Sequence, residues 1–199
     1  MNIQQRMHDV IAAEILALEN ITITPDFERA VLALQQCRGK VITTGMGKAG
    51  LVARKFAATL CSTTTPASFM HPAEAAHGDL GLVDERDTVV AFSTSGESFE
   101  VLEVLELIRH LGVKTIIGIT SHPNSGLRRL SDILVDMGII EEPCSLKLTP
   151  TASILVMLAI SDALALTLMD VKGVTQKDFG LRHHGGYLGR KARTDNLPH

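Results

Sequence analysis

The chain has 199 residues, with 19 Lys and Arg against 22 Asp and Glu, and a formal net charge of −3. This balance, without a basic stripe, argues against nucleic acid as the main partner. Met1–Val10 shows no apolar stretch after a basic start, so we expect no signal peptide. The cysteines are scattered and form no C-x-x-C pair, which predicts a reduced, cytoplasmic protein: Cys37, Cys61 and Cys144.

Two helices are predicted at the start of the chain. Apolar residues at helical spacing indicate a first helix over His8–Glu19. Thr24 as N-cap and Pro25 at the first helical position begin a second helix. That helix runs to about Cys37, and Gly39 ends it.

Strands and helices then alternate along the rest of the chain. The predicted strands are Val41–Thr44, Pro66–Met70, Thr88–Phe92, Thr115–Ile119 and Ile133–Met137. The predicted helices are Gly47–Ser62, Glu97–Leu111, Ser125–Leu130 and a long one from Thr149-Pro150 to about Val171. Parallel strands need crossover connections, so the pattern predicts an α/β fold, a parallel sheet between two layers of helices.

We expect one domain, with N-terminal helices over residues 1–38, an α/β core over 39–172, and a loop and tail over 173–199. The segment Ile154–Met169 is almost wholly apolar, but it is shorter than the roughly 20 residues of a membrane span. Ser161 and Asp162 also interrupt it. We therefore expect a buried helix and no membrane partner.

A run of hydroxyls follows the predicted strand Thr88–Phe92 and precedes a helix. Ser93, Thr94, Ser95 and Ser98 surround Gly96 in this turn. The free N–H groups and positive dipole end of the helix, with these hydroxyls, suit three or four phosphate oxygens. No Lys or Arg lies in the turn, which favours a small phosphate ester. The alternative is an ordinary N-cap, but a cap needs one hydroxyl and this turn offers four.

A glycine turn follows the first strand, with Gly45, Gly47 and Gly50 in the G-x-G-x-x-G pattern of dinucleotide sites. No acidic residue for a ribose hydroxyl ends the next strand, and Ala49 occupies the Ser or Thr position of a phosphate-binding Walker loop. The turn therefore directs Lys48 into the cleft, or Lys48 is simply solvated. We expect no cofactor.

Histidines and carboxylates follow other strands. His71, Glu74, His77 and Asp79 lie within nine residues, but their spacing does not match H-E-x-x-H, and we expect no metal. Glu141 and Glu142 precede the long helix, and His183 and His184 lie in a glycine loop. With a phosphate cradle and a lysine, these groups suit proton transfer next to a sugar carbonyl.

These motifs resemble those of the sugar isomerase (SIS) domain family, and within it the bacterial arabinose 5-phosphate isomerases, over nearly the whole chain. The matching stretches are Gly45–Gly50, His71–Gly81, Ser93–Ser98, Leu148–Ser153, Ser161–Ala165, Asp178-Phe179 and His183–Lys191. The resemblance implies a flavodoxin-like fold with a five-stranded parallel sheet. It also implies a homotetramer whose active sites are shared between subunits.

The resemblance further implies reversible conversion of D-ribulose 5-phosphate to D-arabinose 5-phosphate through an enediolate. The product supplies 3-deoxy-D-manno-octulosonate for lipopolysaccharide. The family's catalytic residues fall on Lys48, His77, Glu100, Glu142 and His183. Its phosphate-binding hydroxyls fall on Ser93, Ser95 and Ser98, to which we add Thr94, Thr44 and Gly47 as substrate-binding candidates.

The roles within this set have alternatives. Glu142 is the first choice for the base and Glu100 is the second. Glu141, one residue before Glu142, is the alternative position for the family's carboxylate. His183, or His77 through another subunit, assists ring opening, and Lys48 stabilises the charged oxygen or contacts the phosphate. Many relatives carry CBS modules after this domain, and we expect none here. The alternatives for the whole chain are isomerisation of another sugar phosphate, such as a hexulose 6-phosphate, and a non-catalytic sugar-phosphate sensor.

Overall fold

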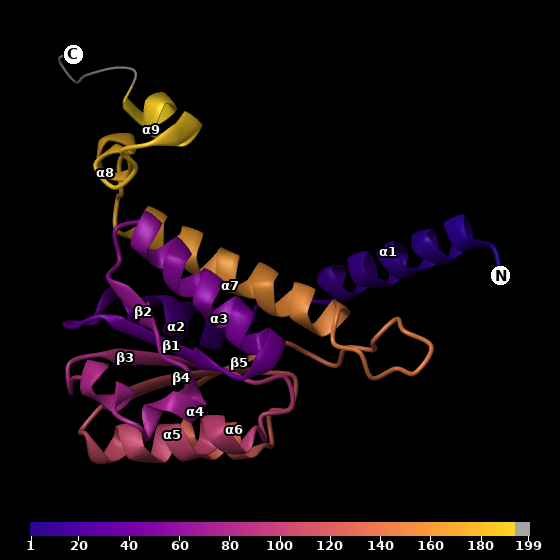
Figure 1. Cartoon of the computed structure of the whole chain (residues 1–199), viewed down its shortest axis with the longest axis horizontal. Coiled ribbons are helices and arrows are strands. Elements are labelled where there is room, and N and C mark those ends of the chain that lie inside the picture. Colours follow the sequence, from indigo (N-terminus) through magenta and orange to yellow (C-terminus); the bar gives the residue numbers. More distant parts are fainter. Residues whose placement is uncertain (194–199) are drawn as a thin grey trace.

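The computed structural model describes residues 1–193, which contain one five-stranded parallel sheet (Figure 1). The strand order is β2-β1-β3-β4-β5. This is the predicted parallel α/β sheet, and its order is that of flavodoxin-like proteins. The strands are β1 Val41–Gly45, β2 Ala67–Phe69, β3 Thr88–Phe92, β4 Thr115–Thr120 and β5 Ile133–Asp136.

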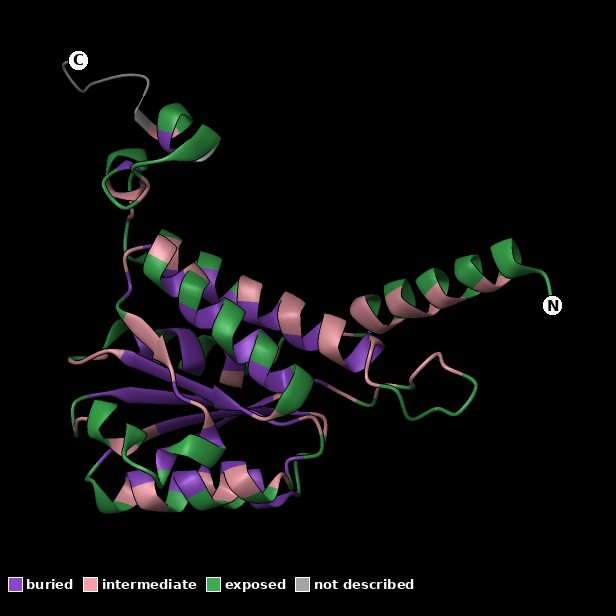
Figure 2. Ribbon diagram, in the orientation of Figure 1, coloured by how far each residue is buried: buried purple, intermediate pink, exposed green. Residues whose placement is uncertain are grey.

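Helices cover both faces of the sheet and complete the three layers (Figures 1 and 2). One face carries α2, α3 and α7, with the C-terminal part of α1 packed against that layer, and the other carries α4, α5 and α6. The bounds are α1 Ile3–Glu19, α2 Pro25–Gln35, α3 Gly47–Ser62, α4 Pro72–Ala75, a 3-10 turn Asp79–Leu82, α5 Phe99–His110, α6 Gly126–Leu130 and α7 Ala152–Val171.

Alternate residues of each central strand enter different halves of the core. Val90 and Phe92 of β3 pack with α2, α3 and α7, whereas Val89 and Ala91 pack with α5. All five residues of β3 are buried. Because neighbouring side chains of a strand point to opposite faces, a strand covered on both faces must be apolar throughout.

The predicted helix and strand bounds agree closely, and the differences have local causes. Helix α1 begins at Ile3, earlier than predicted, because the Asn2 side chain accepts a hydrogen bond from the Gln5 N–H and caps it. Helix α5 begins at Phe99, later than predicted, because the preceding turn contains Gly96 in the left-handed region, with φ of +67°. Gly173, with φ of +64°, follows the end of α7.

The expectation of a loop after residue 173 was wrong, because two short helices lie there, α8 Gln176–Gly180 and α9 Gly186–Arg193. A reciprocal capping box between Thr175 and Asp178 starts α8, a signal that was present in the sequence. The two helices pack on each other, beyond the C-terminal end of α7 and away from the sheet (Figure 1).

Helix α7 has the length and apolar character to cross a membrane, with a mean hydropathy of 2.1 over its most apolar window. Half of that window is buried within the protein, against α1, α2 and α3. Ser161, which lies in the middle of the helix, is fully buried and donates a hydrogen bond to the Leu158 carbonyl. The helix packs as the predicted core helix.

Gly50 permits the close approach of α3 to β1. A Cβ at this position would lie 2.4 Å from the Gly45 carbonyl oxygen, which is backbone and cannot rotate away. We expect Gly50→Ala to lower the free energy of unfolding by about 1–2 kcal/mol in urea denaturation, because overpacking outweighs the helix propensity of alanine. Gly81→Ala is the matched control, since a Cβ there meets nothing within 4 Å. Equal stability of the two variants would contradict this account of the contact.

Candidate functional site

The candidate site lies at the carboxyl edge of the sheet, where the strand order reverses. Strand β1 has β2 on one side and β3 on the other, so the crossovers after β1 and β3 leave in different directions. Ligands of doubly wound sheets bind in the crevice that this reversal opens. A cavity of about 350 Å³ lies here, lined by Met46, Lys48, Ala49, Ser93, Thr94, Ser95, Ser98, His122, Pro150 and Ile154.

The serine loop, residues 93–98, forms one wall of this cavity. Ser93 Oγ and Ser98 Oγ lie 2.9 Å apart, and the Gly96 N–H donates to Ser93 Oγ at 3.1 Å. The Glu97 N–H donates to Ser95 Oγ at 3.2 Å. Ser98 occupies the N-cap position of α5, but its side chain makes no capping hydrogen bond. The hydroxyls therefore bond within the loop, and the ordinary N-cap alternative does not describe Ser98.

The segment after β4 supports the serine loop. Gly96 has a positive φ, and a Cβ there would lie 1.9 Å from Ser125 Oγ. The Gly96 carbonyl accepts from the Leu127 N–H at 2.9 Å, and the Glu97 carboxylate accepts from the Gly126 N–H at 2.6 Å. Only glycine fits both the conformation and the contact, so the loop has a fixed shape.

His122 lines the cavity, and the sequence motifs did not single it out. Its Nδ1 lies 2.9 Å from the Thr94 carbonyl oxygen, which also accepts from the Ser121 N–H and the Thr120 hydroxyl, each at 3.0 Å. Because a carbonyl only accepts, Nδ1 must carry the hydrogen, and Nε2 remains available. The sequence signal that could have identified His122 is its position just after a strand, which it shares with Lys48 and the serines.

Lys48 brings positive charge to the cavity. It lies in the first turn of α3, behind Gly47, whose φ is +60°. Within residues 1–193 the Lys48 ammonium has no hydrogen bond or ion pair, and the side chain is exposed. Thr44, at the end of β1, is fully buried, and its hydroxyl has no hydrogen-bond partner in the described part of the chain. Lys48 thus lies beside the serine loop, as an anion site requires.

Glu142 binds the N-terminus of α7. One carboxylate oxygen accepts from the N–H groups of Thr151 and Ala152 at 2.8 and 2.9 Å, and the other accepts from the N–H and hydroxyl of Ser153. Burial raises the pKa of this carboxyl, but the hydrogen bonds from Ser153 and the helix backbone outweigh burial and hold the pKa below its usual value. Glu141, by contrast, is exposed and faces Lys147 at 3.4 Å.

Four predicted catalytic residues do not line this cavity in the single chain: Glu142, Glu100, His77 and His183. Glu100 is half-buried in the first turn of α5, and His77 is exposed in the turn after α4. His183 lies between α8 and α9, with its ring stacked on Phe179 at 3.8 Å and Nδ1 2.9 Å from the Phe179 carbonyl oxygen. Helix α7 begins beside the cavity and His183 follows its far end, about 30 Å away at 1.5 Å per residue.

The His71–Asp79 segment does not assemble a metal centre in the described residues, where no group of three or more His, Cys, Asp or Glu side chains is placed to hold an ion. His71 contacts the Phe69 ring edge-on, and its Nδ1 is buried without a hydrogen-bond partner in that part of the chain.

Known proteins share both the sequence and the geometry. Residues 33–167 match the SIS domain family. The arabinose 5-phosphate isomerase KdsD of Pseudomonas aeruginosa is 44% identical over 169 residues, which are 85% of this chain and 52% of that protein. The KdsD of Escherichia coli K12 is 42% identical over 200 residues, 98% of this chain and 61% of that protein. The chain therefore spans about half to three-fifths of the length of these relatives.

Two solved structures superpose closely. A protein of Bacteroides fragilis NCTC 9343, assigned as a phosphosugar isomerase involved in capsule formation, has a TM-score of 0.90 and 39% identity, with 94% of this chain and all of that one covered. The c3406 protein of E. coli CFT073, solved in complex with arabinose 5-phosphate, has a TM-score of 0.86 and 39% identity, with 92% and 100% covered. With the match over residues 33–167, these likenesses establish that the chain belongs to the SIS domain family.

Proposed function

We propose that this chain is an aldose–ketose isomerase that interconverts D-arabinose 5-phosphate and D-ribulose 5-phosphate without a cofactor. The observation that carries the proposal is the serine loop beside Lys48 at the reversal of strand order, in a chain 42–44% identical to KdsD enzymes. A relative of similar length was solved with arabinose 5-phosphate bound, which supports the choice of sugar. We further infer a single cytoplasmic domain over residues 1–199 that supplies 3-deoxy-D-manno-octulosonate synthesis.

The phosphate end of the substrate belongs in the serine loop. The free N–H groups at the start of α5, the hydroxyls of Ser95 and Ser98 and the Lys48 ammonium favour a dianion there. His122 acts as a positioning residue, because its hydrogen bond to Thr94 fixes the loop. With the phosphate held, the carbonyl end of a five-carbon sugar extends along the cavity toward the start of α7.

A carboxylate must carry the proton between carbons 1 and 2, by abstraction from one carbon and return to the other. Glu142 is our first candidate because it binds the first residues of α7, between Pro150 and Ile154 of the cavity wall, and is ionised at neutral pH. The same hydrogen bonds occupy both carboxylate oxygens and make Glu142 a weak base, so a catalytic Glu142 must exchange one of them for the proton that it accepts. Glu100 carries no such hydrogen bonds within residues 1–193 and is the second candidate.

We infer that a second subunit completes the site. His183 is one of the predicted catalytic residues. The cavity of its own chain, however, lies at the start of α7, and His183 lies beyond the end of that helix. Exposed apolar side chains at four-residue spacing also run along α1, a pattern that predicts packing against another helix. A homotetramer would cover this stripe and bring His183 to the cavity of a neighbour. These apolar residues are Ile3, Met7, Ile11 and Ile15.

Ser95→Ala tests the phosphate assignment. We expect the KM for D-arabinose 5-phosphate to rise about tenfold with a smaller change in kcat, because a hydrogen bond to a charged group is lost in both ground and transition states. Ser62→Ala, at the other end of α3, is the control and should leave both constants unchanged. A panel of pentose and hexose phosphates assayed with the wild type identifies the sugar. No turnover of any of them would remove the isomerase proposal.

Glu142→Gln and Glu141→Gln form a matched pair for the proton transfer. We expect Glu142→Gln to lower kcat by at least about 100-fold, the usual scale for loss of an acid–base group. Glu141→Gln should stay near the wild type, because that carboxylate is exposed on the surface. The rate of proton–deuterium exchange at carbon 2 of the sugar should likewise fall in Glu142→Gln and stay near the wild-type rate in Glu141→Gln. If Glu142→Gln turns over normally, the base is another residue.

The stability of the same variants separates chemistry from helix capping. Because the folded pKa of Glu142 is lowered, the ionised group stabilises the fold at neutral pH, and this contribution is lost as the pH falls below about 4.3 and through the folded pKa. Glu142→Gln should therefore cost about 1–2 kcal/mol of unfolding free energy at pH 7, as loss of a cap does. The difference from wild type should shrink in acid.

Mixed oligomers test the shared site. We expect Lys48→Ala and His183→Ala each to lose at least about 100-fold in kcat. When the two variants are refolded together, random assembly should return about a quarter of the wild-type activity, because one site in four pairs an intact Lys48 with an intact His183 of a neighbour. Absence of recovery in a confirmed mixed oligomer would contradict a site built from two subunits.

A further inference from the structure

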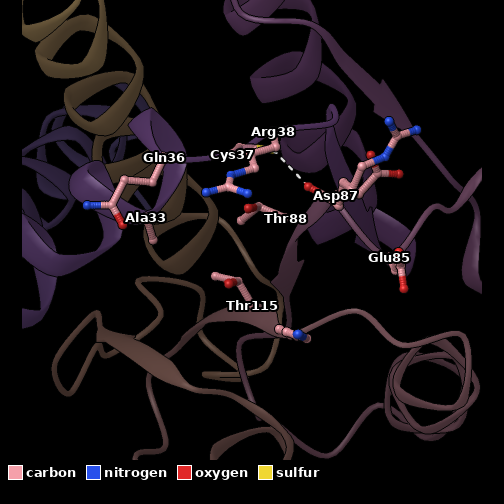
Figure 3. A pocket seen from close by; sticks show the side chains of 10 residues that line it. Ala33, Gln36, Cys37, Arg38, Glu85, Asp87, Thr88 and Thr115 are labelled. Carbon is pink, nitrogen blue, oxygen red and sulfur yellow. Dashed lines mark hydrogen bonds between the residues drawn. The ribbon is translucent and has the colours of Figure 1, made fainter.

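A second and larger cavity lies at the amino edge of the sheet, at the opposite end of the strands from the serine loop. Its volume is about 440 Å³. It lies where α2 ends and where β3 and β4 begin (Figure 3). The lining residues are Ala33, Gln36, Cys37, Arg38, Glu85, Arg86, Asp87, Thr88, Lys114 and Thr115.

Two cations of this cavity have no partner in the described part of the chain. In the view of Figure 3 the Arg38 guanidinium lies above the Thr88 side chain, on the side away from Thr115. Within residues 1–193 neither Arg38 nor Lys114 forms an ion pair or a side-chain hydrogen bond. Unpaired arginine and lysine side chains in a concave site are groups that bind phosphate.

Hydroxyl groups add to these cations. Thr88 is only 3% exposed, yet its hydroxyl has no hydrogen bond within the described residues, and Figure 3 shows it turned toward the Arg38 side of the cavity. Its oxygen is not among the fully buried polar atoms without a partner, so it is open to the cavity and available to a ligand. The Thr115 side chain lies below it, directed into the same space. An oxygen-rich ligand would satisfy these hydroxyls.

The acidic residues at the cavity are largely accounted for. Asp87 accepts hydrogen bonds from the Lys40 N–H and ammonium, at 2.8 and 2.9 Å, and from the Asp84 N–H at 2.9 Å. Arg86 is paired with Asp84 at 2.6 Å. Glu85 lies on the other side of Asp87 from Arg38, and its carboxylate points away from Arg38 (Figure 3). Glu85 has no ion pair in the described residues, so Arg38 and Lys114 outweigh one unpaired carboxylate and the unpaired charge of the lining is net positive.

A structural explanation of the two cations is that they neutralise helix C-termini, because Arg38 follows α2 and Lys114 follows α5. That interaction fades within the last turn of a helix, and both residues lie beyond the helix ends. It also leaves the Thr88 hydroxyl without a partner in the described residues. The cations, hydroxyls and volume together indicate a ligand.

We propose that this cavity binds a small phosphate monoester through Arg38, Lys114 and the hydroxyls of Thr88 and Thr115. The site is separate from the proposed catalytic site, because β3 begins at one and ends at the other, about 17 Å apart at 3.3 Å per residue. The inference does not depend on the isomerase activity, since it concerns binding at the other edge of the sheet.

Calorimetric titration tests this site, and inorganic phosphate does so without turnover. The probes are inorganic phosphate and D-arabinose 5-phosphate, added to the wild type, to Arg38→Gln/Lys114→Gln and to the serine-loop variant Ser95→Ala/Ser98→Ala. Lys177→Gln, an exposed lysine on α8, is the matched control. Urea denaturation of each variant verifies that it is folded. The single variant Lys114→Arg, with Arg38 unchanged, retains the positive charge of the cavity.

We expect two sites per chain in the wild type and in Lys177→Gln. Arg38→Gln/Lys114→Gln should weaken one site at least tenfold and leave KM unchanged, while the serine-loop variant should retain that site and lose the other. Binding of phosphate alone would identify the anion as the recognised part, and binding of the sugar phosphate alone would add the sugar. The proposal is overturned if the serine-loop variant loses all binding, or if the double variant only loses stability.

Discussion

The candidate site depends on the reversal of strand order between β1 and β3. With β2 on one side of β1 and β3 on the other, the connections after these two strands leave in opposite directions. The glycine turn with Lys48 and the serine loop therefore face each other across one crevice. A strand order that moved β1 away from β3 would separate the lysine from the hydroxyls, although every residue of both motifs would be unchanged.

The serine loop keeps its shape because neighbouring elements occupy its hydrogen-bonding groups. Thr94, Gly96 and Glu97 accept hydrogen bonds from residues 120–127, between the end of β4 and the start of α6, so the loop is bonded to a part of the chain more than twenty residues away. A preformed loop loses little conformational entropy when an anion binds. The same principle applies to Glu142, where binding to the start of α7 fixes the carboxylate but lowers its basicity.

The molecule separates its chemistry between the two edges of the sheet. The carboxyl edge has helix N-termini, with free N–H groups and positive dipole ends, beside Lys48 and the serines. The amino edge has helix C-termini, yet a cavity lies there whose two cations are unpaired within residues 1–193. The strands β3 and β4, which are almost wholly buried, span the distance between the two edges.

Local sequence was sufficient to predict the strands, the main helices and the order of the motifs, because burial periodicity and capping residues act over a few neighbours. β3 and α3 were predicted with their observed bounds, and Lys48 and the serine loop were predicted together. Contacts between distant parts of the chain set the rest. They placed His122 against Thr94 and gathered Arg38, Thr88 and Lys114 around one cavity. The tertiary structure also bound Glu142 to the start of α7 and left His183 beyond the far end of that helix. Only the packed sheet and helices bring Arg38, Thr88 and Lys114 together, because these residues are far apart in the chain.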